Sequence, residues 1–159
     1  MSLDPVYPQL VAFDLDYTLW DLWIDTHVRG PLHRNGSKTN EVLDRAYQAL
    51  RLLLVPPQPG DKKLKDAIPA IEFFHQLEIY PGSKLTHFKK LHKKTGIPYN
   101  QMLFFDDEYR NKEVESLGVT FQLVSSAGTT NKLFEKGLEV WRKRHQAEEG
   151  EREGEHGEE

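Results

Sequence analysis

The sequence lacks cysteine altogether, and this absence excludes several kinds of structure and site. A disulfide scaffold, a zinc ion held by thiolates and a cysteine nucleophile all need a residue that the chain does not contain. The absence also favours a reducing compartment, so we expect a cytoplasmic protein, with the nucleus as a second location.

Long apolar runs are also missing. No stretch approaches the roughly 18 consecutive apolar residues of a membrane span. The first residues lack a basic region followed by an apolar core, so we expect no secretory signal and no membrane partner. Hydrophobic residues make up 38% of the 159 and charged residues 29%, which is typical of a soluble globular protein with one domain.

Positive charge is scarce at the C-terminal end. Residues 146–159 hold seven glutamates and one arginine, which gives −6, whereas the whole chain carries −4, so residues 1–145 carry +2. Such a glutamate–glycine segment cannot bury apolar surface. We therefore predict a folded domain over residues 1–145 and a disordered acidic tail over residues 146–159.

Apolar runs alternate with helical periodicities along the chain, which predicts an α/β fold. We expect strands at residues 10–13, 102–105 and 119–124, and a strand within residues 71–80, with or without a short helical lead-in. We expect helices at residues 40–54, 83–95 and 131–144, and a short helix ending at residue 117. The expected architecture is a three-layer, Rossmann-like parallel sheet. Ligands of such folds bind beyond the carboxyl ends of the strands.

Two acidic residues, Asp14 and Asp16, follow the first expected strand. Carboxylates two positions apart at a strand end can face one pocket, where they repel each other and one pKa rises unless a cation lies between them. Mg²⁺ suits that place, because it binds carboxylates together with phosphate oxygens and water. A carboxylate there can also attack phosphorus and form an aspartyl-phosphate. Taken alone, the pair is equally well read as a solvated capping turn.

A second acidic pair, Asp106 and Asp107, follows the apolar run Met102–Phe105 in the same way. If the two strands are parallel neighbours, this pair lies beside Asp14 and Asp16. The four carboxylates then need a metal ion to be stable together. The alternative for the second pair is a helix N-terminus, which negative charge favours.

Lys84 supplies a cation at the start of the helix expected over residues 83–95. Phosphoryl transfer needs positive groups on the phosphoryl oxygens, and the amides of a helix N-terminus can assist. Without the acidic pairs, Lys84 would be read as a surface lysine. Four further lysines form a basic face of this helix: Lys89, Lys90, Lys93 and Lys94. No aromatic side chains interleave with them, so we expect no nucleic-acid partner.

The acidic pairs belong to a longer series of motifs. The series comprises Asp-Leu-Asp-Tyr-Thr-Leu-Trp from Asp14, Trp-Ile-Asp-Thr-His from Trp23, the segments Ile79–Lys84 and Thr86–Phe88, and Phe104–Glu108 followed by Arg110 and Asn111. In this order the motifs resemble those of the magnesium-dependent phosphatase family, a capless branch of the haloacid dehalogenase (HAD) superfamily. The resemblance covers residues 9–34 and about 71–144.

The resemblance implies a role for each residue. Asp14 is the nucleophile, and Asp16 is the general acid that protonates the leaving group and then activates water. The carboxylates of Asp14 and Asp106 and the backbone carbonyl of Asp16 bind Mg²⁺. Asp107 completes or supports the metal shell, and Lys84 holds the phosphate. The implied substrate is a phosphorylated small molecule such as a sugar adduct, or a phosphotyrosine-containing protein, and we expect a monomer.

The sequence departs from the family at the serine or threonine that binds the phosphoryl group at the end of a second strand. Ser37-Lys38-Thr39 is the only good counterpart, so Ser37 and Lys38 are the expected substrate-binding residues beside Lys84. Residues 30–36 contain no apolar run, so we expect the second strand and its preceding helix to be absent. The first strand then has an unpaired edge, unless residues 71–80 replace the missing neighbour.

We therefore expect a magnesium-dependent phosphomonoesterase that acts through an aspartyl-phosphate. The alternative is a catalytically impaired HAD-like homologue, a truncated or alternatively spliced form that acts as a binding protein. A phosphoacceptor domain of response-regulator type is a third reading. It needs an adjacent acidic pair after the first strand and a lone aspartate later, which is the reverse of the order here.

Overall fold

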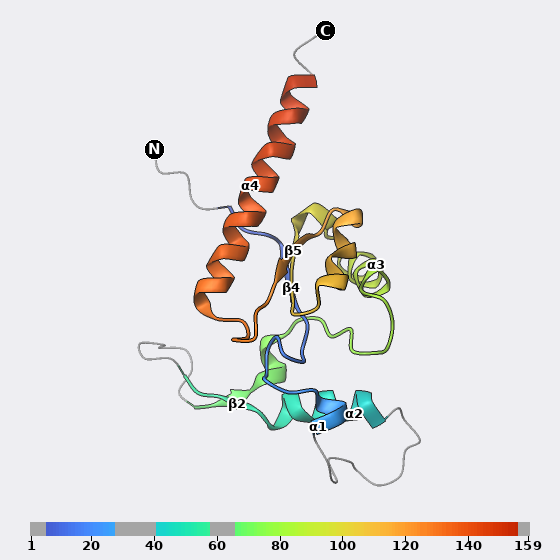
Figure 1. Cartoon of the computed structure of the whole chain (residues 1–159), viewed down its shortest axis with the longest axis vertical. Coiled ribbons are helices and arrows are strands. Elements are labelled where there is room, and N and C mark those ends of the chain that lie inside the picture. The colour runs from blue at the N-terminus through green and yellow to red at the C-terminus, as the bar shows by residue number, and fades with distance from the viewer. Residues whose placement is uncertain (1–5, 28–40, 58–65, 156–159) are drawn as a thin grey trace. The chain divides into compact units, whose positions relative to one another are not determined.

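The computed structural model describes residues 6–27, 41–57 and 66–155 (Figure 1). The chain divides into two compact units, one made of residues 1–22 and 82–159 and the other of residues 23–81. The prediction of a single domain over residues 1–145 stays a prediction. None of the helices in the described ranges combines the length and the hydropathy that a membrane span requires.

The first unit is built on a parallel sheet of three strands in the order β1-β4-β5. The strands are β1 (Leu10–Phe13), β4 (Met102–Asp106) and β5 (Thr120–Leu123). These strands confirm three of the four that the sequence predicts. Their parallel pairing confirms the α/β class.

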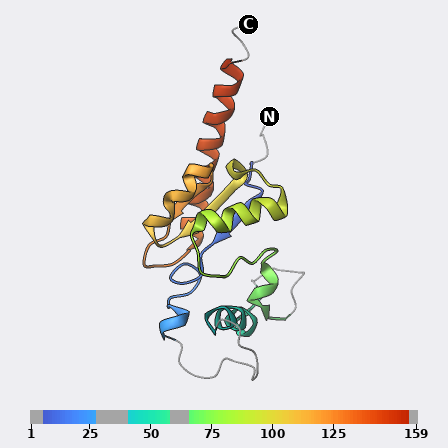
Figure 2. The same cartoon turned by 90° about the vertical axis from the view of Figure 1, so that its right-hand side faces the viewer.

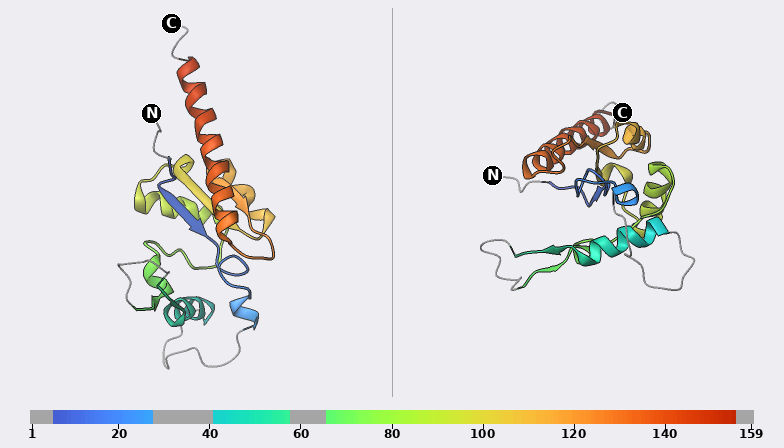
Figure 3. Two further views of the ribbon diagram at one scale, coloured as in Figure 1. Left: turned by 90° about the vertical axis from the view of Figure 1, so that its left-hand side faces the viewer. Right: turned by 60° about the horizontal axis from the view of Figure 1, so that its bottom comes forward.

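Helices cover both faces of this sheet, so that helix, sheet and helix form three layers (Figures 2 and 3). On one face lie α3 (Lys84–Thr95) and the 3₁₀ segment η3 (Tyr109–Leu117), and on the other lies α4 (Asn131–Glu155). The side chains of β4 alternate between two cores, which is why this strand is buried along its whole length. Phe104 packs in the core beneath α3, and Phe105 packs in the core beneath α4.

The register of the sheet brings the ends of β1 and β4 level with each other. Phe13 pairs with Phe105, and the amide of Asp14 donates to the carbonyl of Phe105 at 2.9 Å. Because parallel neighbours end at the same edge of a sheet, Asp14 and Asp106 leave it side by side. The two acidic segments are therefore neighbours, as the sequence predicts.

The N-terminus of α3 is held by a side-chain cap. The hydroxyl of Ser83 accepts a hydrogen bond from the amide of Thr86 at 3.3 Å. At the other end Gly96 adopts the left-handed conformation, with φ of 72°, and closes the helix. The cap places Lys84 in the first turn of α3, beside the carboxyl edge of the sheet.

In its described residues, 23–27, 41–57 and 66–81, the second unit contains two helices, a 3₁₀ turn and a short antiparallel strand pair. Its elements are α1 (Ile24–His27), α2 (Glu41–Leu52), β2 (Leu54–Val55), β3 (Ile68–Pro69) and η1 (Ala70–Phe73). The helix predicted over residues 40–54 is confirmed by α2, which buries Ala46 and Leu50.

The strand predicted over residues 71–80 is wrong. Ile71 to Phe73 belong to η1, and residues 74–80 form no strand. Aromatic residues favour a strand only where a partner strand is available to pack against. These residues therefore do not pair with β1, and among the described strands β1 pairs with β4 alone.

The last helix, α4, is longer than the sequence predicts. The sequence predicts an end near residue 144, whereas α4 continues to Glu155. The disorder predicted for residues 146–159 stays a prediction. Extending a helix requires far less free energy than starting one. Glutamate, glutamine and alanine, which dominate residues 146–149, are also good helix formers.

Gly137 of α4 lies against the buried ring of Phe105, which stacks against both Phe13 and Phe134. A Cβ atom at position 137 would come within 2.5 Å of Phe105 Cζ.

We expect Gly137→Ala to lower the melting temperature, because overpacking by about 1–3 kcal/mol outweighs a gain in helix propensity of about 1 kcal/mol. Thermal unfolding followed by circular dichroism measures the change, with the exposed Lys136→Ala as control. An equal loss in a Phe105→Leu background would contradict this explanation.

Candidate active site

Three carboxyl groups meet at the carboxyl edge of the sheet. Asp14 follows β1, Asp106 ends β4, and Asp107 comes directly after it. One oxygen from each of these side chains lies within 4.8 Å of the other two. The parallel register of β1 and β4 enforces this closeness, so the fold itself creates the concentration of negative charge.

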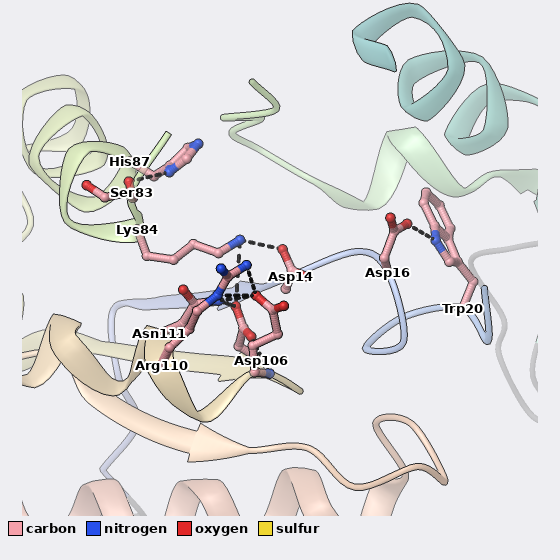
Figure 4. A network of polar contacts seen from close by, with 10 residues as sticks. Asp14, Asp16, Trp20, Ser83, Lys84, His87, Asp106, Arg110 and Asn111 are labelled. Carbon is pink, nitrogen blue, oxygen red and sulfur yellow. Dashed lines mark hydrogen bonds and ion pairs between the residues drawn. The ribbon is translucent and has the colours of Figure 1, made fainter. Parts of the chain in front are cut away.

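Lys84 reaches this cluster from the first turn of α3 (Figure 4). Its Nζ atom lies 2.5 Å from Asp14 Oδ1 and 3.6 Å from Asp106 Oδ2. The side chains of Lys84 and Asp14 are 22% and 25% exposed, whereas that of Asp106 is fully buried. Charges so far removed from water interact more strongly than a surface ion pair does, so Lys84 offsets part of the repulsion among the acids.

Both carboxyl oxygens of Asp106 accept hydrogen bonds. The amide of Glu108 donates to Oδ1 at 2.7 Å, and the buried Asn111 donates from Nδ2 to Oδ2 at 2.8 Å. These bonds fix the orientation of the carboxyl group. Desolvation, and then the charge of Asp14, outweigh them and raise the pKa of Asp106 to about 6.

The neighbouring charges respond to the same environment. Burial raises the pKa of Asp107, and repulsion by Asp14 adds to the effect. Burial opposes the charge of Lys84, but the attraction of Asp14 and Asp106 outweighs it and raises the pKa of the ammonium group. The site thus holds more negative charge than Lys84 offsets.

The donor set fits a hard divalent cation. The group consists of carboxylate oxygens from Asp14, Asp106 and Asp107, and it includes no imidazole. Oxygen ligands of this kind suit Mg²⁺ better than Zn²⁺. Burial is the main cause of the raised pKa values of Asp106 and Asp107, and repulsion by Asp14 adds to it; a cation among these carboxylates would oppose both effects.

Asp16 lies apart from the three clustered acids. Its Oδ1 accepts a hydrogen bond from Nε1 of Trp20 at 2.6 Å, and Figure 4 shows this pair separate from Lys84 and Asp106. Of the four acids expected to converge, the structure brings three together. The role of the Asp16 backbone carbonyl as a metal ligand stays a prediction.

Two of the expected substrate-binding residues, Ser37 and Lys38, lie outside the described residues. The third, Lys84, lines a cavity of about 340 Å³ next to the acid cluster. The other lining residues are Gly82, Ser83, Glu108, Arg110, Asn111 and Glu113. These residues belong to two segments, the start of α3 with the two residues before it, and η3 with the residue before it. The cavity therefore opens beside the proposed phosphate-binding lysine.

Comparison with known proteins agrees with this chemistry. The family model described as Acid Phosphatase matches residues 6–58 and 37–144. A HAD-like hydrolase superfamily protein of Schizosaccharomyces pombe is 41% identical over 151 residues, covering 72% of this chain and 84% of the relative. The human Magnesium-dependent phosphatase 1 is 40% identical over 158 residues, covering 86% and 88%. This chain belongs to the magnesium-dependent phosphatases of the HAD superfamily.

A putative magnesium-dependent phosphatase of Saccharomyces cerevisiae is more distant, at 29% identity over 171 residues, covering 83% of this chain and 96% of the relative. Membership of the magnesium-dependent phosphatases makes the chain an enzyme, a phosphatase, as the sequence predicts. The comparisons do not favour the alternative of an impaired homologue that only binds partners.

Sequence reasoning assigned no role to Glu108 and Asn111, although both belong to the motif that resembles the magnesium-dependent phosphatases. Asn111 binds Asp106, and Glu108 Oε2 accepts from Nε and Nη2 of Arg110 at 2.8 and 2.6 Å. Asn111 comes five positions after Asp106, the last residue of β4. It returns to the end of this strand because the chain turns into η3 at Tyr109.

The raised pKa of Asp106 predicts how this phosphatase responds to pH without metal. Because the pKa rises from 3.8 to about 6 on folding, the group stabilises the fold below pH 4, and this contribution is lost as the pH rises to about 6. We expect Asp106→Asn to melt above the wild type at pH 7 in EDTA and to match it near pH 4. Melting curves across this range measure the difference. A difference in melting temperature between the two proteins that stays the same from pH 4 to pH 7 would contradict the raised pKa.

Proposed function

We propose that the chain is a Mg²⁺-dependent phosphomonoesterase in which Asp14 attacks phosphorus and forms an aspartyl-phosphate. The observation that carries this proposal is the meeting of three carboxylates and one lysine at the carboxyl edge of the sheet. Phosphoryl transfer needs an anionic nucleophile beside groups that neutralise the phosphoryl oxygens. This edge of the fold supplies both.

Asp14, Asp106 and Asp107 would hold Mg²⁺. When bound, the ion neutralises charge on the phosphoryl oxygens and lets a dianionic ester approach the carboxylates. Asn111 and the amide of Glu108 keep the Asp106 carboxyl group oriented for this task.

Lys84 has two successive tasks in the proposed reaction. Before substrate binds, its ammonium group pairs with Asp14 and Asp106 and offsets their repulsion. When a phosphoryl group enters, the same ammonium group binds a phosphoryl oxygen and stabilises the charge that develops there. Lys84 lies in the first turn of α3, and the N-terminus of a helix favours an anion.

Asp16 serves as the acid and then as the base. As the P–O bond breaks, Asp16 gives its proton to the leaving oxygen, while an Asp14 oxygen bonds to phosphorus. Water then attacks this phosphorus, Asp16 takes one proton from the water, and the bond to Asp14 breaks to release phosphate. Protons and charges balance over the two steps.

The substrate we propose is a phosphorylated small molecule or a phosphoprotein, with phosphotyrosine or a phosphorylated sugar adduct as the candidates. The cavity beside Lys84 supports a leaving group that makes polar contacts, because its lining includes Glu108, Arg110 and Glu113. Its volume of about 340 Å³ is at the lower end of the range for small-molecule sites. We further propose that the protein works as a monomer without a nucleic-acid or membrane partner.

We also infer that this chain is capless and lacks the second strand of the family's sheet, together with the helix before it. The alignment with the human relative supports the loss of this segment. It runs over 158 positions, but the 86% of this 159-residue chain that it covers is only about 137 residues. The relative therefore has residues without a counterpart in this chain. Within the described residues, β1 has β4 as its strand partner and no second neighbour.

The first test of the proposed activity is hydrolysis of 4-nitrophenyl phosphate. We expect turnover that requires Mg²⁺ and disappears in EDTA, because the acids repel a dianionic ester without a cation. Asp14→Asn should remove turnover, since an amide is a poor nucleophile. Asp21→Asn, a change of an exposed acid on the same loop, is the matched control and should retain it. Equal turnover by the Asp14 variant and the wild type would refute the role of Asp14.

Lys84→Met separates the two tasks of the lysine. We expect kcat/KM to fall about 10²–10³-fold, as for removal of one oxyanion-hole donor. Mg²⁺ should bind the variant more tightly, because Lys84 no longer competes for the Asp14 oxygen. Kinetics and a magnesium titration followed by melting temperature measure the two effects. Weaker magnesium binding by the variant would contradict this competition.

A further inference from the structure

We propose that Trp20 is a positioning residue that orients the Asp16 carboxyl group for proton transfer with the leaving group. The inference rests on the proposed function, because it concerns the acid–base step of that reaction. It assigns a role to an aromatic residue that follows the two catalytic aspartates in the same loop.

The contact is a side-chain hydrogen bond. Trp20 Nε1 donates to Asp16 Oδ1 at 2.6 Å, and both side chains are half-buried (Figure 4). The indole N–H is a donor only, so it can bind a carboxyl oxygen but cannot take a proton from Asp16. A hydrogen bond to a carboxylate is shorter and about twice as strong as one between neutral groups. The bond therefore selects one orientation of the carboxyl group.

The loop between these two residues is folded tightly enough to keep them in contact. The carbonyl of Leu15 accepts from the amides of Thr18, Leu19 and Trp20, at 3.2, 2.9 and 3.4 Å. Tyr17 adopts φ of 52°, the one positive value among the non-glycine residues that the structure describes. A tyrosine reaches this left-handed region only when its surroundings impose it.

A second contact ties this loop to the segment after β5. The carbonyl of Thr18 accepts from the amide of Thr129 at 3.0 Å, and Gly128, with φ of 70°, makes the turn that brings this amide close. Thr18 itself is 1% exposed. The loop is thus anchored on both sides of Asp16, at β1 and at Thr129, and Trp20 does not have to order a mobile segment.

The chemical consequence concerns which oxygen carries the proton. With Oδ1 accepting from Trp20, the acid form of Asp16 carries its proton on Oδ2. That oxygen gives the proton to the leaving oxygen as the P–O bond breaks, and it takes a proton from water in the second step. Without the indole donor, the carboxyl group loses the contact that holds Oδ1, and fewer encounters place Oδ2 near the leaving oxygen.

If Trp20 positions Asp16, the loss of activity on its substitution depends on the leaving group; if Trp20 only supports the fold, the loss does not. A nitrophenolate departs without a proton, whereas an alkoxide needs one. Loss of Asp16 orientation therefore slows alkyl phosphates more than nitrophenyl phosphates. Damage to the fold slows both by the same factor, because it acts on the nucleophile and the phosphate-binding groups alike.

The test measures kcat/KM for a series of phosphate esters from 4-nitrophenyl phosphate to an alkyl phosphate, in Mg²⁺, for the wild type and Trp20→Phe. We expect Trp20→Phe to lose about 10-fold on the alkyl ester and less than about twofold on the nitrophenyl ester. Trp20→His, which keeps a ring N–H donor, should recover part of the loss. Leu19→Ala changes an exposed side chain of the same loop without removing a donor and is the matched control.

Equal loss on all esters, or no loss on any, would overturn the role of Trp20 while leaving the phosphatase proposal in place. A wild type that hydrolyses none of the esters would overturn both. If Trp20→Phe does not fold, NMR of the wild type and Asp16→Asn replaces it. The indole N–H signal of Trp20 should shift strongly between these two proteins, and an unchanged signal would exclude the contact.

Discussion

The pairing of Lys84 with Asp14 and Asp106 is the interaction on which the site depends. Two parallel strands that end in register place carboxylates at one edge of the sheet, and the fold offers them no other arrangement. A buried carboxylate such as Asp106 needs a compensating charge, and Lys84 provides it from the capped start of α3. The compensation is partial, and the remaining negative charge is what makes the site suited to a cation.

The incomplete compensation of charge also bears on the reaction that the site can carry out. A site with fully paired charges would be stable but inert towards a phosphate ester. Here burial, and then the charge of Asp14, raise the pKa of Asp106, and a divalent ion bound to these carboxylates would favour their charged forms. In the proposed mechanism, Lys84 then becomes available to the phosphoryl group instead of to Asp14. The proposal thus gives one side chain two tasks, pairing with the acids in the resting protein and binding an anion in the reaction.

Much of the first unit follows from its sequence. The apolar runs before Asp14 and Asp106 predict two buried strands, and Ser83 and Gly96 mark the ends of α3, because capping and periodicity are local signals. Pairing of the strands could be inferred because parallel α/β sheets bring strand ends together. The resemblance supplied the roles of the residues and the identity of the metal.

Other features depend on contacts that no local pattern records. The aromatic run at residues 71–80 has strand propensity but no neighbour to pair with, so η1 forms at its start instead. Asp-x-Asp spacing reveals neither the contact of Asp16 with the Trp20 indole nor the left-handed conformation of Tyr17. Asn111 reaches Asp106 only through the course of η3.

The central claim is that Asp14, at the point where these charges meet, becomes covalently phosphorylated. The most direct measurement is peptide mass spectrometry of the enzyme quenched with acid during turnover of an aryl phosphate in Mg²⁺. The account predicts one phosphoryl group on the peptide that contains Asp14, located on that residue by fragmentation. Steady turnover with no phosphoryl group on Asp14, or with one on a different residue, would contradict it.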